Sequence, residues 1–371
     1  MKSVKNGLSG IVVGLIFFAI GICMLWFNEG NNVKNIKAVN EGRKVAVDVA
    51  NKPVNAKNNG KLVALSGKLN ILSGPVVDET FNVSIDSPKL LRVVEMYQWE
   101  EVEDNDSDGD TSYSYKKVWQ DELIDSSSFY YSDTHQNPTS MPYPSTKILA
   151  TEVKIGDFIV ADNQKDMLAT DKSIDDLSMA TIPVGYSAKG AYITTEVEET
   201  KVGDVRISFV YSNAQEASII GQQKDNMIID YTTKSGKQIN SLQEGIHNAS
   251  AMLDTIEKNN NLLKWALRFF GWLLLLIGIG TLFRPIEMLA NIIPIFGKLV
   301  GAITGVFSFL LATIIALFTI SIAWIFYRPL IGIGLLVVVT GLIILMVKSV
   351  KKKTATPAVA TTPVPPVNPP V

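Results

Sequence analysis

The sequence contains little of the chemistry on which most catalytic and metal sites depend. Among 371 residues there is one cysteine, Cys23, and there are two histidines, His135 and His247. A single cysteine excludes an internal disulfide framework and a zinc site built from cysteines. No Walker loop, dinucleotide-binding fingerprint, HExxH motif or complete nucleophile elbow occurs. We therefore expect a protein that is not an enzyme, with no catalytic residues, no cofactor and no metal site.

Charged residues are also scarce, at 19% against about a quarter in average soluble proteins, and they are unevenly spread. Residues 28–261 contain 23 Lys and Arg and 35 Asp and Glu, whereas the rest of the chain contains 11 basic residues and one acidic residue, Glu287. An acidic segment is repelled by a phosphate backbone, so we expect no nucleic-acid partner. The two oppositely charged parts also argue against a single soluble globule.

Four apolar segments predict transmembrane helices, because about 20 apolar residues in a helix span the hydrocarbon core of a bilayer. They are residues 7–27, 262–283, 299–327 and 330–347. The first is too long for a signal-peptide core and lacks a small-residue cleavage site, so we expect it to stay as an anchor. The second contains Arg268, close enough to its end to extend to the membrane surface. No Asp or Glu lies within the four segments, which argues against a proton-coupled transporter.

Basic residues near both ends of the chain predict the orientation of these helices. Lys2 and Lys5 precede the first helix, and Lys348 and residues 351–353 follow the last. The positive-inside rule places both termini in the cytoplasm, which four spans allow. Residues 28–261 are then on the non-cytoplasmic side. The remaining cytoplasmic parts are an N-terminus over 1–6, an interfacial segment or plain loop over 284–298, and a basic, then proline-rich, disordered tail over 348–371.

The segment 28–261 has the composition of short strands separated by turn residues. We therefore predict a multi-pass α-helical membrane protein with four transmembrane helices and a large β-rich (α+β) extramembrane domain between helices 1 and 2. At the end of this domain, apolar residues recur every three or four positions over 238–258 and predict an amphipathic helix. This helix would pack on the domain or bind a partner. The expected strands are 61–72, 89–99, 111–124, 158–161, 191–197 and 205–211.

A hairpin rich in aromatic residues is the most clearly defined part of this domain. Residues 91–102 lead into an acidic loop, and SYSYKKVWQDEL returns. Alternation places Tyr97 and Trp99 on one face of the first strand and Tyr115 and Trp119 on one face of the second. These four are our candidate interaction residues, because aromatic side chains on strands make good interface anchors. The alternative is that the hairpin belongs to the core.

The acidic loop of this hairpin resembles half of a calcium site. Residues 104–109 (DNDSDG) match the first half of an EF-hand loop, D-x-[DN]-x-[DN]-G. The motif requires a glutamate at its twelfth position, where this chain has Tyr115. We therefore interpret the loop as a solvated turn and leave weak calcium binding open.

Glycines at four-residue spacing mark candidate helix-packing positions. Gly10 and Gly14 form one GxxxG motif, and Gly297, Gly301 and Gly305 form two in series. Such positions let two helix backbones approach closely. They would pack the helices of one chain together or form the interface of a homo-oligomer.

Seven short sequence motifs occur along the chain in a recognisable order. They are Asn28-Glu29-Gly30, Val94-Glu95-Met96-Tyr97-Gln98-Trp99, Tyr113-Ser114-Tyr115, VGDVRISF over 202–209, TKSG over 233–236, Pro294-Ile295-Phe296 and WIFYRPL over 324–330. Through these motifs the sequence from about Trp26 to about Val347 resembles the transmembrane protein 43 family, also called LUMA. The proline-rich tail departs from the family pattern, and the Lys-, Asn- and Ile-rich composition would suit a bacterial relative.

The resemblance implies self-association and a role in organising membrane-protein assemblies, with no catalytic residue set. In animals the family is placed in the endoplasmic reticulum and inner nuclear membrane; a bacterial member would lie in the cytoplasmic membrane. We therefore predict a non-enzymatic scaffold with the lipid bilayer, copies of itself and other membrane proteins as partners. Its β-rich domain would present binding surface to proteins or lipid headgroups on the non-cytoplasmic side. The alternative is a channel or transporter component, and a remote one is a membrane-anchored hydrolase.

Overall fold

The computed structural model describes residues 2–105, 111–196, 199–290 and 294–328. These residues form two compact units, each described here by itself. The first, called the helical unit, takes its described residues from Met1–Val33, Leu267–Arg284 and Gly305–Val371. The second, called the β unit, takes them from Lys34–Ala266 and Pro285–Thr304.

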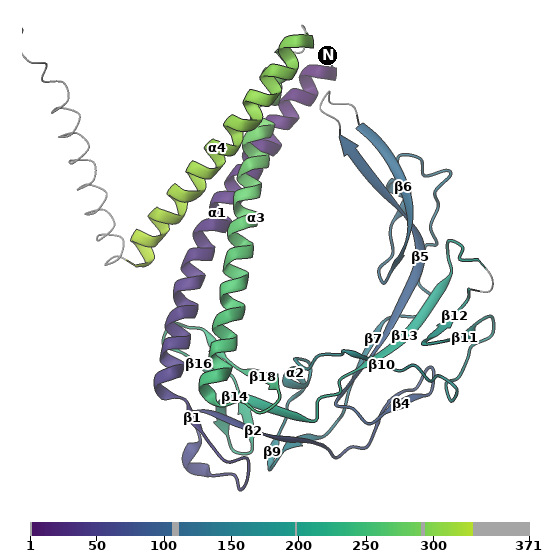
Figure 1. Ribbon diagram of the computed structural model, residues 1–371, viewed down its shortest axis with the longest axis vertical. Helices are drawn as coiled ribbons and strands as arrows, with labels where there is room; N and C mark the ends of the chain where they lie inside the picture. The colour runs from purple at the N-terminus through teal and green to yellow at the C-terminus, as the bar shows by residue number, and fades with distance from the viewer. Residues whose placement is uncertain (1, 106–110, 197–198, 291–293, 329–371) are drawn as a thin grey trace, which may run out of the picture. The chain divides into compact units, whose positions relative to one another are not determined.

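Three long helices supply the helical unit (Figure 1): α1 (Lys2–Val45), α3 (Ala249–Ala290) and α4 (Pro294–Tyr327). Each contains a stretch that is long and apolar enough to cross a membrane. Within the unit they pack through a small apolar core, and many apolar side chains outside it are exposed, as contact with lipid requires. The fully buried members of this core are Leu25, Leu275, Ile279, Ala312 and Ala316.

The helices extend beyond the boundaries that the sequence predicts. The first was expected to end at residue 27 but continues to Val45 as α1, and α3 continues through Pro285 to Ala290. Residues 284–290 are therefore helical rather than a plain loop, because Ile286–Ala290 are mostly good helix formers. Their location at the membrane interface stays a prediction. Helix α4 begins at Pro294, before the expected residue 299, because proline suits the first position of a helix. The expected fourth span, 330–347, and the tail, 348–371, lie outside the described residues and stay predictions.

The first of two seven-stranded sheets in the β unit closes on itself. Strand β2 pairs with β14 in antiparallel fashion, from Leu62 opposite Gln222 to Lys68 opposite Glu216. The other edge of β2 pairs with β8, and β8, β9 and β15 lead back to β14. The strands of this sheet are β1 (Val47–Asp48), β2 (Leu62–Ile71), β8 (Val153–Ile155), β9 (Phe158–Ile159), β14 (Glu216–Lys224), β15 (Met227–Ile229) and β18 (Ser241–Glu244).

The second sheet is organised around β5, which is 17 residues long. Strand β5 pairs with β13 along one edge and with β7 and then β6 along the other. Its strands are β5 (Lys89–Asn105), β6 (Thr111–Gln120), β7 (Thr146–Leu149), β10 (Lys172–Ser173), β11 (Ser187–Lys189), β12 (Tyr192–Thr194) and β13 (Val205–Tyr211). The remaining elements are β3 (Val76–Asp78), β4 (Val83–Ile85), α2 (Asp162–Lys165), β16 (Tyr231–Thr232), β17 (Gln238–Ile239), and the 3-10 turns Ala56–Asn58 and Ser126–Ser128.

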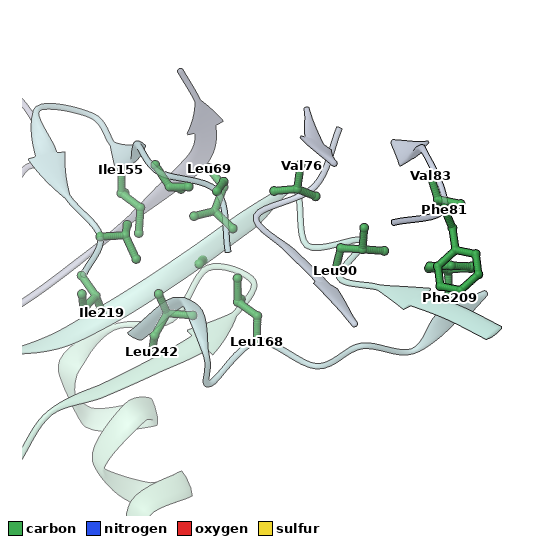
Figure 2. Packing of buried hydrophobic residues seen from close by; sticks show 14 of the residues in the cluster. Leu69, Val76, Phe81, Val83, Leu90, Ile155, Leu168, Phe209, Ile219 and Leu242 are labelled. Carbon is green, nitrogen blue, oxygen red and sulfur yellow. The ribbon is translucent and has the colours of Figure 1, made fainter. Parts of the chain in front are cut away.

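One apolar core joins the two sheets of the β unit. Figure 2 shows side chains of the first sheet, such as Ile155 and Ile219, in one cluster with Leu90 and Phe209 of the second. Phe81, between β3 and β4, is fully buried and its ring packs edge-on against that of Phe209. Because this core takes side chains from both sheets, the two sheets belong to one folded domain.

The helix expected over 238–258 begins eleven residues later. Residues 238–239 and 241–244 form β17 and β18, and α3 begins at Ala249. Strand β18 pairs with β14, which gives its backbone long-range partners in place of helical ones. Gly245 then turns the chain at a φ of 85°, and the Asn248 side chain caps the helix by accepting a hydrogen bond from the Ala251 amide. Ile239 and Leu242 are buried on two short strands, and their spacing of three residues is the same as that of apolar residues on one face of a helix.

Candidate functional site

The aromatic hairpin of β5 and β6 brings the four candidate interaction residues onto one face. Tyr97 lies opposite Trp119, and their ring centroids are 5.2 Å apart. Trp99 lies opposite Lys117, whose ammonium nitrogen is 4.7 Å from the Trp99 ring centroid. Tyr115 lies opposite Glu101 and donates its hydroxyl hydrogen to the Glu101 carboxylate. All four aromatic side chains are half-buried and lie outside the apolar core.

The segment 125–137 covers part of this aromatic face. His135 stacks on Tyr115 with 3.7 Å between ring centroids, and it meets the edge of Trp99 at 4.6 Å. The Asn137 side chain bonds both the amide and the carbonyl of Trp99, so it occupies the edge of β5 as a neighbouring strand would. Loss of hydration, together with the hydrogen bond to Glu101, raises the pKa of the Tyr115 hydroxyl.

Two further tyrosines form the outer surface of this cluster. Tyr130 stacks on Tyr113 with 4.4 Å between ring centroids, and its amide donates to the Glu101 carboxylate. Tyr131 donates its amide hydrogen to the Tyr115 hydroxyl oxygen. Their side chains remain 63% and 55% exposed, respectively. We call the set Tyr97, Trp99, Tyr113, Tyr115, Trp119, Tyr130, Tyr131 and His135 the aromatic patch.

At one end of the aromatic patch an arginine lies between two aromatic rings. The Arg206 guanidinium is 4.5 Å from the Trp119 ring centroid and 5.3 Å from that of Tyr192. Its Nε and Nη2 donate to the two oxygens of Glu95 at 2.7 and 2.8 Å, and this pairing raises the pKa of Arg206. The pocket beside it has a volume of about 270 Å³ and is also lined by Lys189. Since Glu95 already neutralises Arg206, this pocket is not an open anion site.

In the helical unit, a buried carboxylate joins the three helices. Glu29 of α1 has no exposed area. Its Oε1 accepts a hydrogen bond from Arg268 Nε of α3, and its Oε2 accepts one from Trp324 Nε1 of α4, each at 2.7 Å. The Arg268 side chain is 13% exposed, and its charge is paired within the helical unit. The carboxylate of Glu29 lies on another helix, 239 positions earlier in the chain. It neutralises the Arg268 guanidinium through a charge-assisted hydrogen bond.

Glycines of α1 and α3 let the two helix backbones touch. A Cβ atom at Gly14 would lie 2.8 Å from the carbonyl oxygen of Gly278, and one at Gly21 would lie 2.9 Å from that of Gly271. Gly10 also faces α3, since its Cβ position is 3.8 Å from Thr281 Cγ2. Of the other candidate packing glycines, Gly305 has no atom of the described residues within 4 Å. The surroundings of Gly297 and Gly301 lie outside the described side chains.

Comparison with known proteins agrees with the resemblance seen in the sequence. The family model for transmembrane protein 43 matches residues 96–329, well over half of the chain. The chain belongs to the transmembrane protein 43 family. Transmembrane protein 43 of Mus musculus is 31% identical over 341 residues, which cover 86% of this chain and 85% of that protein. The Homo sapiens protein is 30% identical with the same coverage, and a Drosophila melanogaster homolog is 29% identical, covering 87% and 90%. No solved structure matches the chain.

These relatives of the transmembrane protein 43 family carry names that state a membrane location and no activity. Among the described residues, no three His, Cys, Asp or Glu side chains lie together as a metal site would require. The acidic loop of the hairpin falls largely on residues 106–110, outside that part of the chain, so weak calcium binding there stays untested.

The sequence analysis assigned no structural or binding role to several residues of this transmembrane protein 43 family member. Tyr130 and Tyr131, the most exposed rings of the aromatic patch, stand in the run Phe129-Tyr130-Tyr131, which is a visible signal. Glu29 stands two residues past the first apolar run, and Trp324 near the end of the third. Only the fold brings these two side chains to Arg268.

Proposed function

We propose that this member of the transmembrane protein 43 family is a non-enzymatic membrane scaffold. It oligomerises and presents its β-rich domain to partner proteins or lipid headgroups on the non-cytoplasmic side. The observation that carries the proposal is the exposure of Tyr130 and Tyr131 above a layer of stacked rings. Aromatic side chains already held by stacking lose little conformational freedom on binding, which makes them effective interface anchors.

Removing the exposed rings tests the proposal. The double substitution Tyr130→Ala and Tyr131→Ala should leave the full chain folded, because both side chains are more than half exposed. It should reduce chemical crosslinking between copies in membranes severalfold. Met179→Ala, which changes an apolar side chain that is 83% exposed elsewhere in the domain, is the matched control. Equal crosslinking of the wild type, the double variant and the control would remove the support for the aromatic patch as an interface.

A second substitution separates recognition from folding. Trp99 is half-buried beneath His135, so Trp99→Ala should lower the thermal unfolding midpoint as well as crosslinking. If Trp99→Ala lowers the midpoint but Tyr130→Ala with Tyr131→Ala changes nothing, the hairpin serves the fold alone.

Protease added to sealed cells or right-side-out vesicles tests the orientation. With both termini in the cytoplasm, the protease should cleave the β-rich domain and spare the tail at 348–371. The opposite pattern would overturn the proposed presentation of the domain.

A further inference from the structure

Helix α1 contributes Glu29 and helix α3 contributes Arg268 to the helical unit, and neither helix neutralises this charge itself. No oppositely charged residue stands three or four positions away from Glu29 or from Arg268, the spacings at which helix side chains pair. A charge that is enclosed among packed helices without a partner is strongly unfavourable. In the packed unit the two charges meet at 2.7 Å, and Glu29 is completely enclosed. Each helix therefore supplies what the other lacks.

Helix α4 fits against the same point through its last turn. The Trp324 indole can only donate, and its hydrogen goes to the second oxygen of Glu29. Three residues later, the Tyr327 ring lies over Gly30, where a Cβ atom would stand 2.5 Å from its Cζ. Trp26 packs against the rings of Phe326 and Tyr327, with centroids 5.6 and 5.9 Å away. The adjoining residues Glu29 and Gly30 thus provide an acceptor and a space for one turn of α4.

We propose that Glu29, Arg268 and Trp324 form an assembly latch for the three membrane helices. Helices α1 and α3 pair through the Glu29–Arg268 contact, and α4 docks onto the other carboxylate oxygen. The latch is specific for α4, because the docking helix must contain an N–H donor for the Glu29 carboxylate and, one turn later, an aromatic ring that packs over Gly30. Buried ion pairs are poor sources of net stability but can specify a single arrangement, and that is the role assigned here.

Two cysteine pairs in the full chain can report the two steps separately. Native Cys23 is first replaced by serine, since it is exposed and would react. Gly10→Cys with Thr281→Cys reports α1 against α3, because these positions are in van der Waals contact. Trp26→Cys with Phe326→Cys reports α1 against α4, where the two rings pack together. The measurement is the temperature at which the crosslinking yield of each pair falls by half in mild detergent.

Removing one hydrogen from the latch should release α4 alone. Trp324→Phe keeps a ring and deletes the N–H, so the α1–α4 midpoint should fall by about 5 °C while the α1–α3 midpoint stays unchanged. The matched control is Trp272→Phe, which deletes an indole hydrogen that bonds the neutral Thr313 hydroxyl between α3 and α4. Its effect should be smaller, because hydrogen bonds to charged groups are stronger.

Removing a charge should release both contacts. Glu29→Gln or Arg268→Gln should lower both midpoints by about 10 °C, and the exchange of Glu29→Arg with Arg268→Glu should recover part of the α1–α3 midpoint. If Trp324→Phe leaves the α1–α4 midpoint unchanged, or lowers it no more than Trp272→Phe does, the docking step is wrong. If the exchange is no better than the single variants, the pairing step is wrong.

Discussion

Two glutamate–arginine pairs of nearly the same chemistry lie in two different environments. In the helical unit, Arg268 donates to Glu29, and the Trp324 ring centroid is 5.9 Å from the guanidinium. In the β unit, Arg206 donates twice to Glu95, and the Trp119 ring centroid is 4.5 Å from the guanidinium. The Glu29 side chain has no exposure, whereas the Glu95 side chain retains 21%. The two pairs make similar contacts. They differ in whether water can reach the remaining charge when one partner is removed.

A third pair separates burial from the kind of unit, because it is buried but lies in the β unit. Arg92 and Asp78 lie in the β unit with side-chain exposures of 5% and 2%. The Arg92 Nη1 bonds both oxygens of Asp78, which also accepts the amides of Thr80 and Phe81. We expect that removing one partner from either buried pair leaves a charge without compensation, whereas removing one from the partly exposed Arg206–Glu95 pair lets water compensate.

The largest loss of stability should follow from removing the carboxylate of the buried Arg92–Asp78 pair in the β unit. Asp78→Ala leaves the Arg92 guanidinium without its carboxylate and two backbone amides without their acceptor. We expect the free energy of unfolding to fall by about 3–5 kcal/mol, measured by denaturant unfolding of the full chain in detergent. The control is Glu100→Gln, which breaks an exposed pair with Lys116 and should change stability by less than about 1 kcal/mol. Similar losses in the two variants would show that burial does not decide.

The next largest effect should come from the glycine seam, which holds the helical unit by shape without charge. Gly278→Leu would place a Cβ atom 2.8 Å from the backbone nitrogen of Phe18 and 2.9 Å from the carbonyl oxygen of Gly14, so the helices must separate. We expect a loss of about 1–3 kcal/mol, seen as a lower thermal midpoint in detergent. Gly280→Leu is the matched control, since no atom of the described residues lies within 4 Å of its Cβ position. Equal thermal unfolding midpoints for Gly278→Leu and Gly280→Leu would contradict the prediction.

A smaller effect should follow from Glu95→Gln, the counterpart of Glu29→Gln at a partly exposed pair. Arg206 keeps its contacts with Trp119 and Tyr192 and gains hydration, because its side chain is 28% exposed. We expect the free energy of unfolding to fall by about 1 kcal/mol or less. A loss equal to that of Glu29→Gln, measured under the same conditions, would mean that the two pairs do not differ in the way proposed.

The smallest effect should appear in acid, at an exposed carboxylate. Hydrogen bonds from Lys147 and then Lys89 hold the pKa of Asp166 below its ordinary value, which is about 3.9 in unfolded chains. A carboxylate whose pKa is lower in the folded state than in the unfolded state stabilises the fold. This stabilisation is complete at a pH above the unfolded-state pKa, and it is lost as the pH falls through the folded-state pKa. The difference in unfolding midpoint between wild type and Asp166→Asn should therefore be present at about pH 6 and shrink below about pH 4. A constant difference across this range would contradict the assignment.

Local pattern was enough to predict the hairpin and the existence of the membrane helices. Alternating aromatics from Tyr97 to Trp119 predicted one face, and the pairing of β5 with β6 confirms it. The apolar runs predicted the helices, and three of them lie in the described residues. These signals work because each residue's environment depends on neighbours within a turn or a strand.

Long-range partners explain what local pattern could not supply. Strand β14 was not predicted, since Glu216–Lys224 contains a glycine and polar residues, yet it pairs with β2, β15 and β18. The helix expected over 238–258 was wrong at its start for the same reason, because pairing with β14 outweighs an apolar spacing of three and four. The Glu29–Arg268 contact joins positions 239 apart, a separation at which no local window carries information.

The close approaches of α1 and α3 repeat at intervals of seven, from Gly14 to Gly21 and from Gly271 to Gly278. A seven-residue repeat runs slightly behind two full turns of a straight helix, so helices that keep it in contact coil around each other with a left-handed twist. Adding one residue between Gly14 and Gly21 would rotate the following part of α1 by about 100° about the helix axis. Gly21 would then face away from α3. Adding seven would bring it nearly back, so this pair of helices is sensitive to chain length in steps.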